Sequence, residues 1–90
     1  MDIKNILCIN SYPTLDLHGV DRETARVLVN DFVNEQYKLK KEFIVIVHGI
    51  GSGIVKKVTH DTLKLNKRVL EYYTAYNNNG STIVKLDIRA

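Results

Sequence analysis

The middle of the chain holds an uninterrupted run of β-branched and aromatic residues, Phe43-Ile44-Val45-Ile46-Val47. Such a run is typical of a strand that is covered on both faces, as in a parallel sheet. The chain has 90 residues, of which 44% are hydrophobic and 26% are charged, and this is the balance of an ordinary globular domain. We therefore expect one domain with one core.

Helical patterns precede and follow this run. The segment L-D-L-H-G at 15–19 is a short alternation that ends in glycine, which predicts a strand that stops at the glycine. A helix is then predicted from about Arg22 to Tyr37, with Asp21 as its N-cap. A second amphipathic helix is predicted from Ile54 to near Asn66, with Ser52 as a candidate N-cap.

The last third of the chain predicts a β-hairpin. Val69 to Tyr76 and Ser81 to Ile88 are β-rich runs, and Asn77-Asn78-Asn79-Gly80 between them contains the Asn-Gly pair that favours a tight turn. Ile6 to Ile9 could add a short lead-in strand, but Tyr12-Pro13 separates it from the first core strand. The element order is therefore β-α-β-α-β-β.

Charge is distributed unevenly along the chain. The net charge of +3 divides into −3 for residues 1–37, +6 for residues 38–68 and 0 for residues 69–90. The basic middle segment also contains most of the glycine. This combination predicts an anion site in the middle segment.

The N-terminal region bears on the cellular location of the protein. The four apolar residues Ile6 to Ile9 are too few for a signal peptide, and no stretch approaches the ~20 apolar residues needed to cross a bilayer. Cys8 is the single cysteine and lies in this apolar run, so we expect a buried thiol in a reducing compartment. A cytoplasmic location without a membrane partner follows.

Two histidines and an aspartate stand where predicted strands end. Asp16 and His18 project to the same side of their strand, and His48 ends the next one. The carboxyl ends of parallel strands are where open α/β sheets bind ligands, so these side chains are expected around one crevice. Asp16 would orient His18 as a general acid or base, with His48 as its complement. The alternative is that Asp16 caps a turn and that both histidines are scaffold residues.

The segment Gly49-Ile50-Gly51-Ser52-Gly53 opens the second predicted helix. Its backbone N–H groups and the helix dipole could hold a phosphate oxygen, together with Lys56 and Lys57 one turn further on. The alternative is a strand-to-helix turn that only requires positive φ angles. The spacing matches neither the Walker P-loop nor the G-x-G-x-x-G dinucleotide motif.

Other polar and aromatic residues give weaker signals. Asp16, His18 and His48 could supply three metal ligands, but no Cys or His pair has a recognised zinc spacing, so no cofactor is expected and a divalent ion stays an open alternative. His60 lies on the second predicted helix, where a solvated position is expected. The tyrosines Tyr72, Tyr73 and Tyr76 fit packing on the sheet better than base stacking.

Together, L-D-L-H-G at 15–19 and V-H-G-I-G-S-G at 47–53 resemble the two motifs of the Smr (small MutS-related) domain family. The resemblance extends from about Leu15 to Leu86. It implies a free-standing Smr domain at 15–90 with an N-terminal extension at 1–14. It also implies a two-layer fold with a mixed four-stranded sheet and two helices, similar to the C-terminal domain of bacterial translation initiation factor three. The family motifs tied to activity map to Asp16, His18, Gly19, His48, Gly49, Gly51 and Gly53.

The chain departs from the usual H-G-x-G-T-G-x-L-R pattern of that family. Ser52 replaces threonine, Val55 replaces leucine, and Lys56 replaces arginine. Lysine keeps the charge but lacks the bidentate fork of arginine, which loosens a phosphate clamp. Ile50 occupies a position where the family often has a basic residue. These departures weaken the predicted anion site.

The resemblance implies nucleic-acid binding and, as in several members, endonuclease activity. Our leading hypothesis is cleavage of RNA, or nicking of DNA, by acid–base chemistry, because the 2′-hydroxyl of RNA can act as the nucleophile without a metal. The alternative is a non-catalytic module that binds RNA, DNA or the ribosome through the same surface. A third reading is a binder of small phosphorylated metabolites.

Overall fold

The computed structural model describes residues 12–51, 53–75 and 78–89. Several predictions concern residues outside these ranges: the lead-in strand at 6–9 and the buried thiol of Cys8, as well as the positions of Ser52 and Tyr76.

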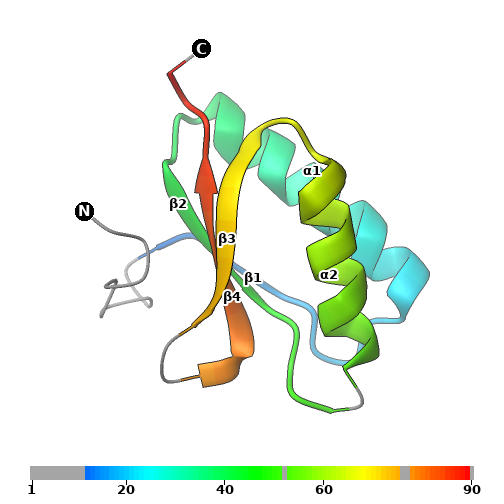
Figure 1. The fold of residues 1–90 in the computed structure, drawn as a ribbon. Coiled ribbons are helices and arrows are strands. Elements are labelled where there is room, and N and C mark those ends of the chain that lie inside the picture. Colours follow the sequence, from blue (N-terminus) through cyan, green and yellow to red (C-terminus); the bar gives the residue numbers. More distant parts are fainter. Residues whose placement is uncertain (1–11, 52, 76–77, 90) are drawn as a thin grey trace.

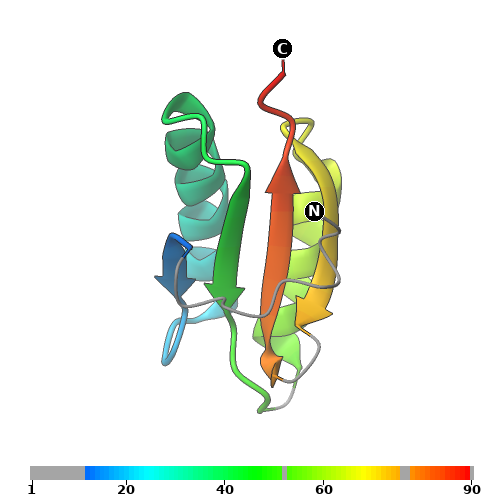
Figure 2. The ribbon, with the colours of Figure 1, turned by 90° about the vertical axis from the view of Figure 1, so that its left-hand side faces the viewer.

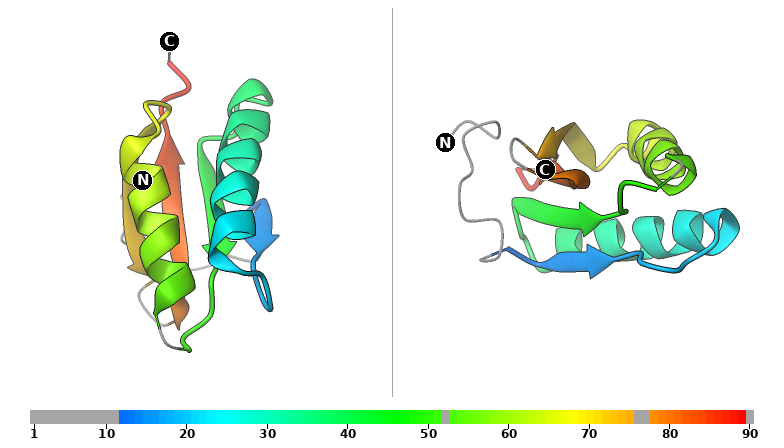
Figure 3. Two further views of the ribbon diagram at one scale, coloured as in Figure 1. Left: turned by 90° about the vertical axis from the view of Figure 1, so that its right-hand side faces the viewer. Right: turned by 90° about the horizontal axis from the view of Figure 1, so that it is seen from below.

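The chain folds into two layers, with both helices on one face of a sheet (Figure 1, Figure 3). The elements are β1 (Thr14–Asp16), α1 (Arg22–Lys38), β2 (Phe43–Val47), α2 (Ile54–Leu65), β3 (Val69–Ala75) and β4 (Asn78–Leu86). The sheet has four strands in the order β1-β2-β4-β3. Strand β1 is parallel to β2, whereas β4 is antiparallel to both of its neighbours. The predicted element order and the mixed two-layer fold are confirmed.

Strand β2 lies inside the sheet, between β1 and β4 (Figure 2). Its residues from Phe43 to Ile46 are all buried, as the uninterrupted apolar run predicted. Ile44 and Ile46 belong to the main core under the helices, with Leu17, Val29, Val33, Leu63, Val84 and Leu86. Phe43 belongs to a second cluster with Ala75 and Ile83. The strand is therefore packed on both faces.

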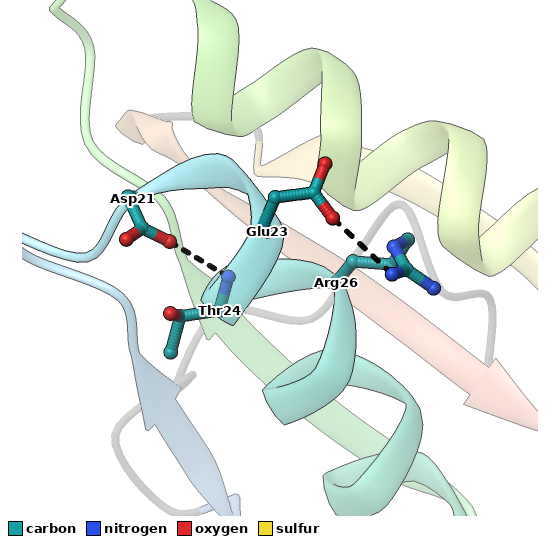
Figure 4. A network of polar contacts seen from close by, with 4 residues as sticks. All are labelled: Asp21, Glu23, Thr24 and Arg26. Carbon is teal, nitrogen blue, oxygen red and sulfur yellow. Dashed lines mark hydrogen bonds and ion pairs between the residues drawn. The ribbon is translucent and has the colours of Figure 1, made fainter.

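Helix α1 begins where the sequence predicted. The side chain of Asp21 accepts a hydrogen bond of 2.7 Å from the backbone N–H of Thr24, which confirms Asp21 as the N-cap (Figure 4). In the first turn of the helix, Glu23 forms an ion pair of 3.2 Å with Arg26 on the exposed face (Figure 4). The buried residues Ala25, Val29 and Val33 recur every four positions and face the sheet.

The predicted hairpin exists, but the prediction that Asn78 to Gly80 belong to its turn is wrong. Strand β4 already begins at Asn78, and Asn78 pairs with Ala75 on β3. The register between the two strands shifts next to Ala75. The carbonyl of Gly80 accepts hydrogen bonds of 2.9 Å from the backbone N–H groups of His48 and Gly49. These nonlocal bonds hold Gly80 in an extended strand and override the local turn preference of the Asn-Gly pair.

The connections lie at two opposite ends of the molecule (Figure 1). The β1–α1 and β2–α2 connections, the end of β3 and the start of β4 lie at the lower end in Figure 1, which we call the loop end. The α1–β2 and α2–β3 connections and the end of β4 lie at the upper end, which we call the far end. The principal extents of the molecule are 34 × 26 × 19 Å.

Candidate functional site

The glycine-rich segment after β2 makes a tight turn into α2. Gly49, Gly51 and Gly53 all have positive φ angles, of 82°, 27° and 85°, which only glycine adopts without strain. Gly53 is the N-cap of α2 and makes no side-chain cap hydrogen bond, so the prediction of Ser52 as N-cap is wrong. No side chain of the N-cap residue therefore covers the first backbone N–H groups of α2 at the loop end.

This turn borders a hollow of about 260 Å³ at the loop end. The hollow is lined by residues of the β1–α1 turn and of the segment from β2 into α2, namely Gly19, Val20, His48, Gly49, Ile50, Gly51, Gly53, Val55 and Lys56. The N-terminus of α2 carries the positive end of the helix dipole, and Lys56 adds a full positive charge. An anion such as a phosphate fits this electrostatic environment.

Lys57 was predicted beside Lys56 at the anion site, but it does not line the hollow. Its ammonium group lies 3.1 Å from a carboxylate oxygen of Asp61, one helical turn further along α2. Both side chains are largely exposed. The charge of Lys57 is therefore partly balanced by Asp61, and Lys56 is the cation that faces the hollow.

The predicted pair of Asp16 and His18 takes a different form from the one expected. The backbone N–H of His18 donates a hydrogen bond of 2.9 Å to Oδ1 of Asp16. The carboxylate therefore caps the turn after β1, which is the alternative that the sequence left open. His18 is exposed and precedes Gly19, whose φ of 74° turns the chain toward the hollow. Neither Asp16 nor His18 lines the hollow itself.

His48 lines the hollow but is buried, with 6% of its surface exposed. Its Nδ1 lies 2.9 Å from the carbonyl oxygen of Gly49, and its Nε2 lies 2.8 Å from Oγ1 of Thr82. A carbonyl oxygen can only accept, so Nδ1 carries the proton. In the neutral ring Nε2 then accepts the hydroxyl proton of Thr82. Both ring nitrogens are engaged, and the imidazole fastens the start of the loop to β4.

His60 is the site residue that the sequence missed, and the prediction of a solvated position is wrong. His60 is partly buried, and the centre of its ring lies 5.0 Å from the ring centre of Tyr72 and 6.0 Å from that of His48. Its Nε2 lies 2.8 Å from Oγ1 of Thr82. Because the hydroxyl donates to His48, it accepts the Nε2 proton of His60. A one-way chain of hydrogen bonds thus runs from His60 through Thr82 and His48 to the loop carbonyl of Gly49.

A sequence signal for His60 existed. It lies three residues before Leu63 on α2, and Leu63 is fully buried in the core. Residues three apart on a helix share a face, so His60 belongs to the inward side of α2.

Burial sets the ionisation of this histidine pair. Loss of solvation lowers the pKa of His48 below its usual 6.5, although the hydrogen bond to Gly49 opposes this shift. The pKa of His60 is also lowered by burial, and then by the neighbouring His48 and Lys56, while Asp61 acts in the opposite direction. Both rings therefore favour the neutral form that the one-way chain of hydrogen bonds requires.

The remaining predictions concern metals and tyrosines. In the part of the chain that the structure describes, no three His, Cys, Asp or Glu side chains gather as metal ligands, and no helix is long and apolar enough to cross a membrane. Tyr72 packs against His60 and the main core, and the hydroxyl of Tyr73 donates to Glu71 over 2.9 Å. Both tyrosines thus take part in packing on the sheet, as expected.

Comparisons with known proteins agree with this fold. The family model described as Smr domain matches residues 15–87. Endonuclease MutS2 of Aquifex aeolicus is 35% identical over 77 residues, covering 82% of this chain and 10% of that protein. The chain thus spans about a tenth of the length of this relative.

Two solved structures are similar to this chain as well. The crystal structure of the Smr domain of Thermus thermophilus MutS2 has a TM-score of 0.81 and 26% identity, covering 83% of this chain and 98% of that one. The crystal structure of YdaL, a stand-alone small MutS-related protein from Escherichia coli, has a TM-score of 0.78 and 25% identity, covering 88% of this chain and 71% of that one.

Proposed function

This chain belongs to the Smr domain family, and from that premise we propose that it binds nucleic acid and cleaves phosphodiester bonds, in RNA rather than DNA. The observation that carries the proposal is the hollow at the loop end, where the N-terminus of α2 and Lys56 offer positive charge beside the turn that bears the exposed His18. The name of the MutS2 relative, an endonuclease, supports the same reading.

In the proposed reaction the scissile phosphate occupies the hollow. The 2′-hydroxyl oxygen of RNA attacks the phosphorus atom, and His18 takes the hydroxyl proton as general base. The bond from phosphorus to the 5′ oxygen breaks, and that oxygen leaves with a proton from solvent. Lys56 and the α2 dipole stabilise the additional negative charge on the phosphate oxygens. Asp16 holds the turn of His18, and the buried His48 holds the glycine-rich loop in place.

A second candidate function is nucleic-acid binding without cleavage. It is favoured by the engagement of both ring nitrogens of His48, which leaves His18 as the one exposed imidazole among the described residues. It is also favoured by Lys56, since a single ammonium group cannot clamp a phosphate with two parallel hydrogen bonds. The same surface would then bind RNA, DNA or the ribosome without cutting a phosphodiester bond.

Incubation of the purified protein with end-labelled RNA and DNA, with and without EDTA, tests the proposal. We expect RNA cleavage that His18→Ala slows by roughly 10² to 10⁴ while the fold is retained. Asp31→Ala, a change at an exposed position of α1, is the control and should cleave at the normal rate. Cleavage that survives His18→Ala would contradict the catalytic role of His18, and binding without any cleavage would favour the second candidate.

A further inference from the structure

We propose that the far end of the molecule is a second contact surface for the phosphate backbone of a nucleic acid, distinct from the hollow at the loop end. This inference rests on the proposed function, because it extends the same ligand across the molecule. It starts from the basic segment 38–68, whose eight lysines and arginines the fold divides between the two ends.

Six of these eight residues lie at or just before the turns of the far end (Figure 1). Five of them are exposed, and we call these the far-end lysines: Lys38, Lys40, Lys41, Lys64 and Lys67. Two hydrogen bonds of 2.8 Å tie the turns that carry them to the end of β4. The N–H of Leu86 donates to the carbonyl of Glu42, and the N–H of Asp87 donates to the carbonyl of Arg68. The lysines therefore lie around one end of the sheet.

The far-end lysines are available to a partner. Within the described ranges none of the five takes part in an ion pair. Two nearby carboxylates already face other cations, since Glu42 lies 4.0 Å from Lys85 and Asp87 lies 3.5 Å from Arg89. The sixth basic residue, Arg68, is not part of the surface. Its guanidinium group donates to Asn34 over 2.9 Å and lies 4.8 Å from the ring centre of Tyr37.

The loop end lacks a comparable excess of positive charge. Of its cations, Arg26 is paired with Glu23 and Lys57 with Asp61. Arg22, the exposed first residue of α1, stands in the sequence between the acidic residues Asp21 and Glu23. The hollow itself is lined by one cation, Lys56. One cation can hold one phosphate, whereas a longer strand of nucleic acid presents a row of phosphates that requires further positive charge.

Lys40 differs from the other far-end lysines in its backbone conformation. Its φ of 59° is left-handed, and it is the one non-glycine residue with a positive φ among those the structure describes. It follows the C-cap residue of α1, a position at which glycine is the usual residue. The N–H of Lys40 donates to the carbonyl of Tyr37, and the N–H of Lys41 donates to the carbonyl of Gln36, over 3.0 Å each. The residue at this strained backbone position is a lysine, and its exposed side chain adds to the positive charge of the far end.

The chemistry of this surface fits a phosphate backbone. Lysine ammonium groups neutralise phosphates and release counterions without reading sequence. Two exposed leucines, Leu39 and Leu65, lie among the lysines, and single exposed apolar side chains are common on protein surfaces. The longest extent of the molecule is 34 Å, which matches ~10 steps of a duplex at about 3.4 Å each. One duplex can therefore reach both ends.

The test compares two double variants that change the net charge equally. Lys41→Gln with Lys67→Gln alters the far end, and Lys56→Gln with Lys57→Gln alters the loop end. Binding is measured against salt concentration for an RNA single strand of about 4 nucleotides and for an RNA duplex of about 16 base pairs, which is longer than the molecule. On the duplex the far-end variant should lose roughly 1.4 to 1.8 from the slope of log K against log salt, at 0.7 to 0.9 per lost contact. On the short strand it should bind like the unchanged protein.

The remaining outcomes separate the two proposals. A far-end variant with an unchanged slope on the duplex overturns this inference, and the proposed function stands if the loop-end variant loses binding. An equal loss on both probes also overturns the inference, because it would reflect net charge alone. Failure of the unchanged protein to bind either probe overturns the proposed function as well. A far-end variant that binds the duplex normally but no longer co-sediments with vesicles of anionic phospholipid, as the unchanged protein does, would assign the surface to a membrane and overturn the inference.

Discussion

Thr82 joins two histidines that come from different parts of the chain. Its hydroxyl group has one proton to give and can accept from a second donor, so it can satisfy His48 and His60 together. Removing it would leave two ring nitrogens in a buried place without a partner, and each such group costs free energy. A second buried threonine, Thr59, has a hydroxyl that makes no hydrogen bond within the described part of the chain.

These two threonines form a matched pair for mutagenesis. Thr82→Val should lower the free energy of unfolding by about 2 kcal/mol, because it orphans buried imidazole nitrogens. Thr59→Val, the same change at a site that is 0% exposed, should leave stability unchanged or raise it. Urea unfolding followed by circular dichroism measures both. Equal losses in the two variants would mean that the bridge to the histidines contributes nothing specific.

Local and distant contacts explain which site residues the sequence could predict. Asp21 was predicted as a helix cap because its partner, Thr24, lies three residues away. Helical spacing places His60 on the inward side of α2, but its partner Thr82 is 22 residues away on strand β4, and no local pattern identifies that partner. The inward direction of His48 likewise depends on the register of β2 against β4.

At the scale of elements, the spacing of hydrophobic residues predicted most of the helices and strands. Strand β2 was predicted at its observed bounds, and both helices were predicted to within about one residue at each end. The hairpin was less accurate, because Asn-Gly is a local signal whereas the start of β4 is fixed by pairing with Ala75 and by bonds from His48 and Gly49. The first strand was predicted to continue to Gly19, but β1 ends at Asp16. The carboxylate of Asp16 accepts a hydrogen bond from the N–H of His18 and turns the chain there.

The end of α1 allows a prediction about a single helix terminus. Lys40→Gly should raise the free energy of unfolding by about 1 kcal/mol, because glycine adopts the left-handed conformation without the steric cost that lysine bears. Lys38→Gly, two residues earlier and inside the helix, should lower it by up to about 1 kcal/mol. Thermal unfolding of both variants measures these opposite signs. A destabilised Lys40→Gly variant would contradict the strain at this turn.

At the scale of the whole molecule, the fold rearranges the charge that the linear sequence displays. The segment 38–68 carries a charge of +6 and contains the glycine-rich loop, so read linearly it predicted one anion site. Helix α2 has 12 residues and spans about 18 Å, which separates Lys56 at its first turn from Lys64 at its last. The helices therefore divide one basic segment between two ends, and a charge profile along the chain cannot reveal that division.

Acid should weaken the folded state through the pair formed by the buried His48 and the partly buried His60. The pKa values of His48 and His60 are lowered from 6.5 in the folded protein, so below about pH 6.5 the unfolded chain binds protons that the folded protein does not. The free energy of unfolding should therefore fall as the pH drops below 6.5 and level off below the folded pKa values. Asp21, whose pKa is lowered by its bonds to Thr24, contributes a loss only at lower pH, below about 3.8.

Urea unfolding between about pH 7.5 and pH 5 measures this dependence. His60→Gln supplies the control, because glutamine can still donate an N–H to Thr82 but does not titrate. The variant should lose less stability over this range than the unchanged protein, since one of the two titrating rings is gone. A free energy of unfolding that does not change with pH in the unchanged protein would contradict this prediction. It would mean that the histidine pair takes up protons in the folded state, and that the one-way chain of hydrogen bonds through Thr82 reverses at little cost.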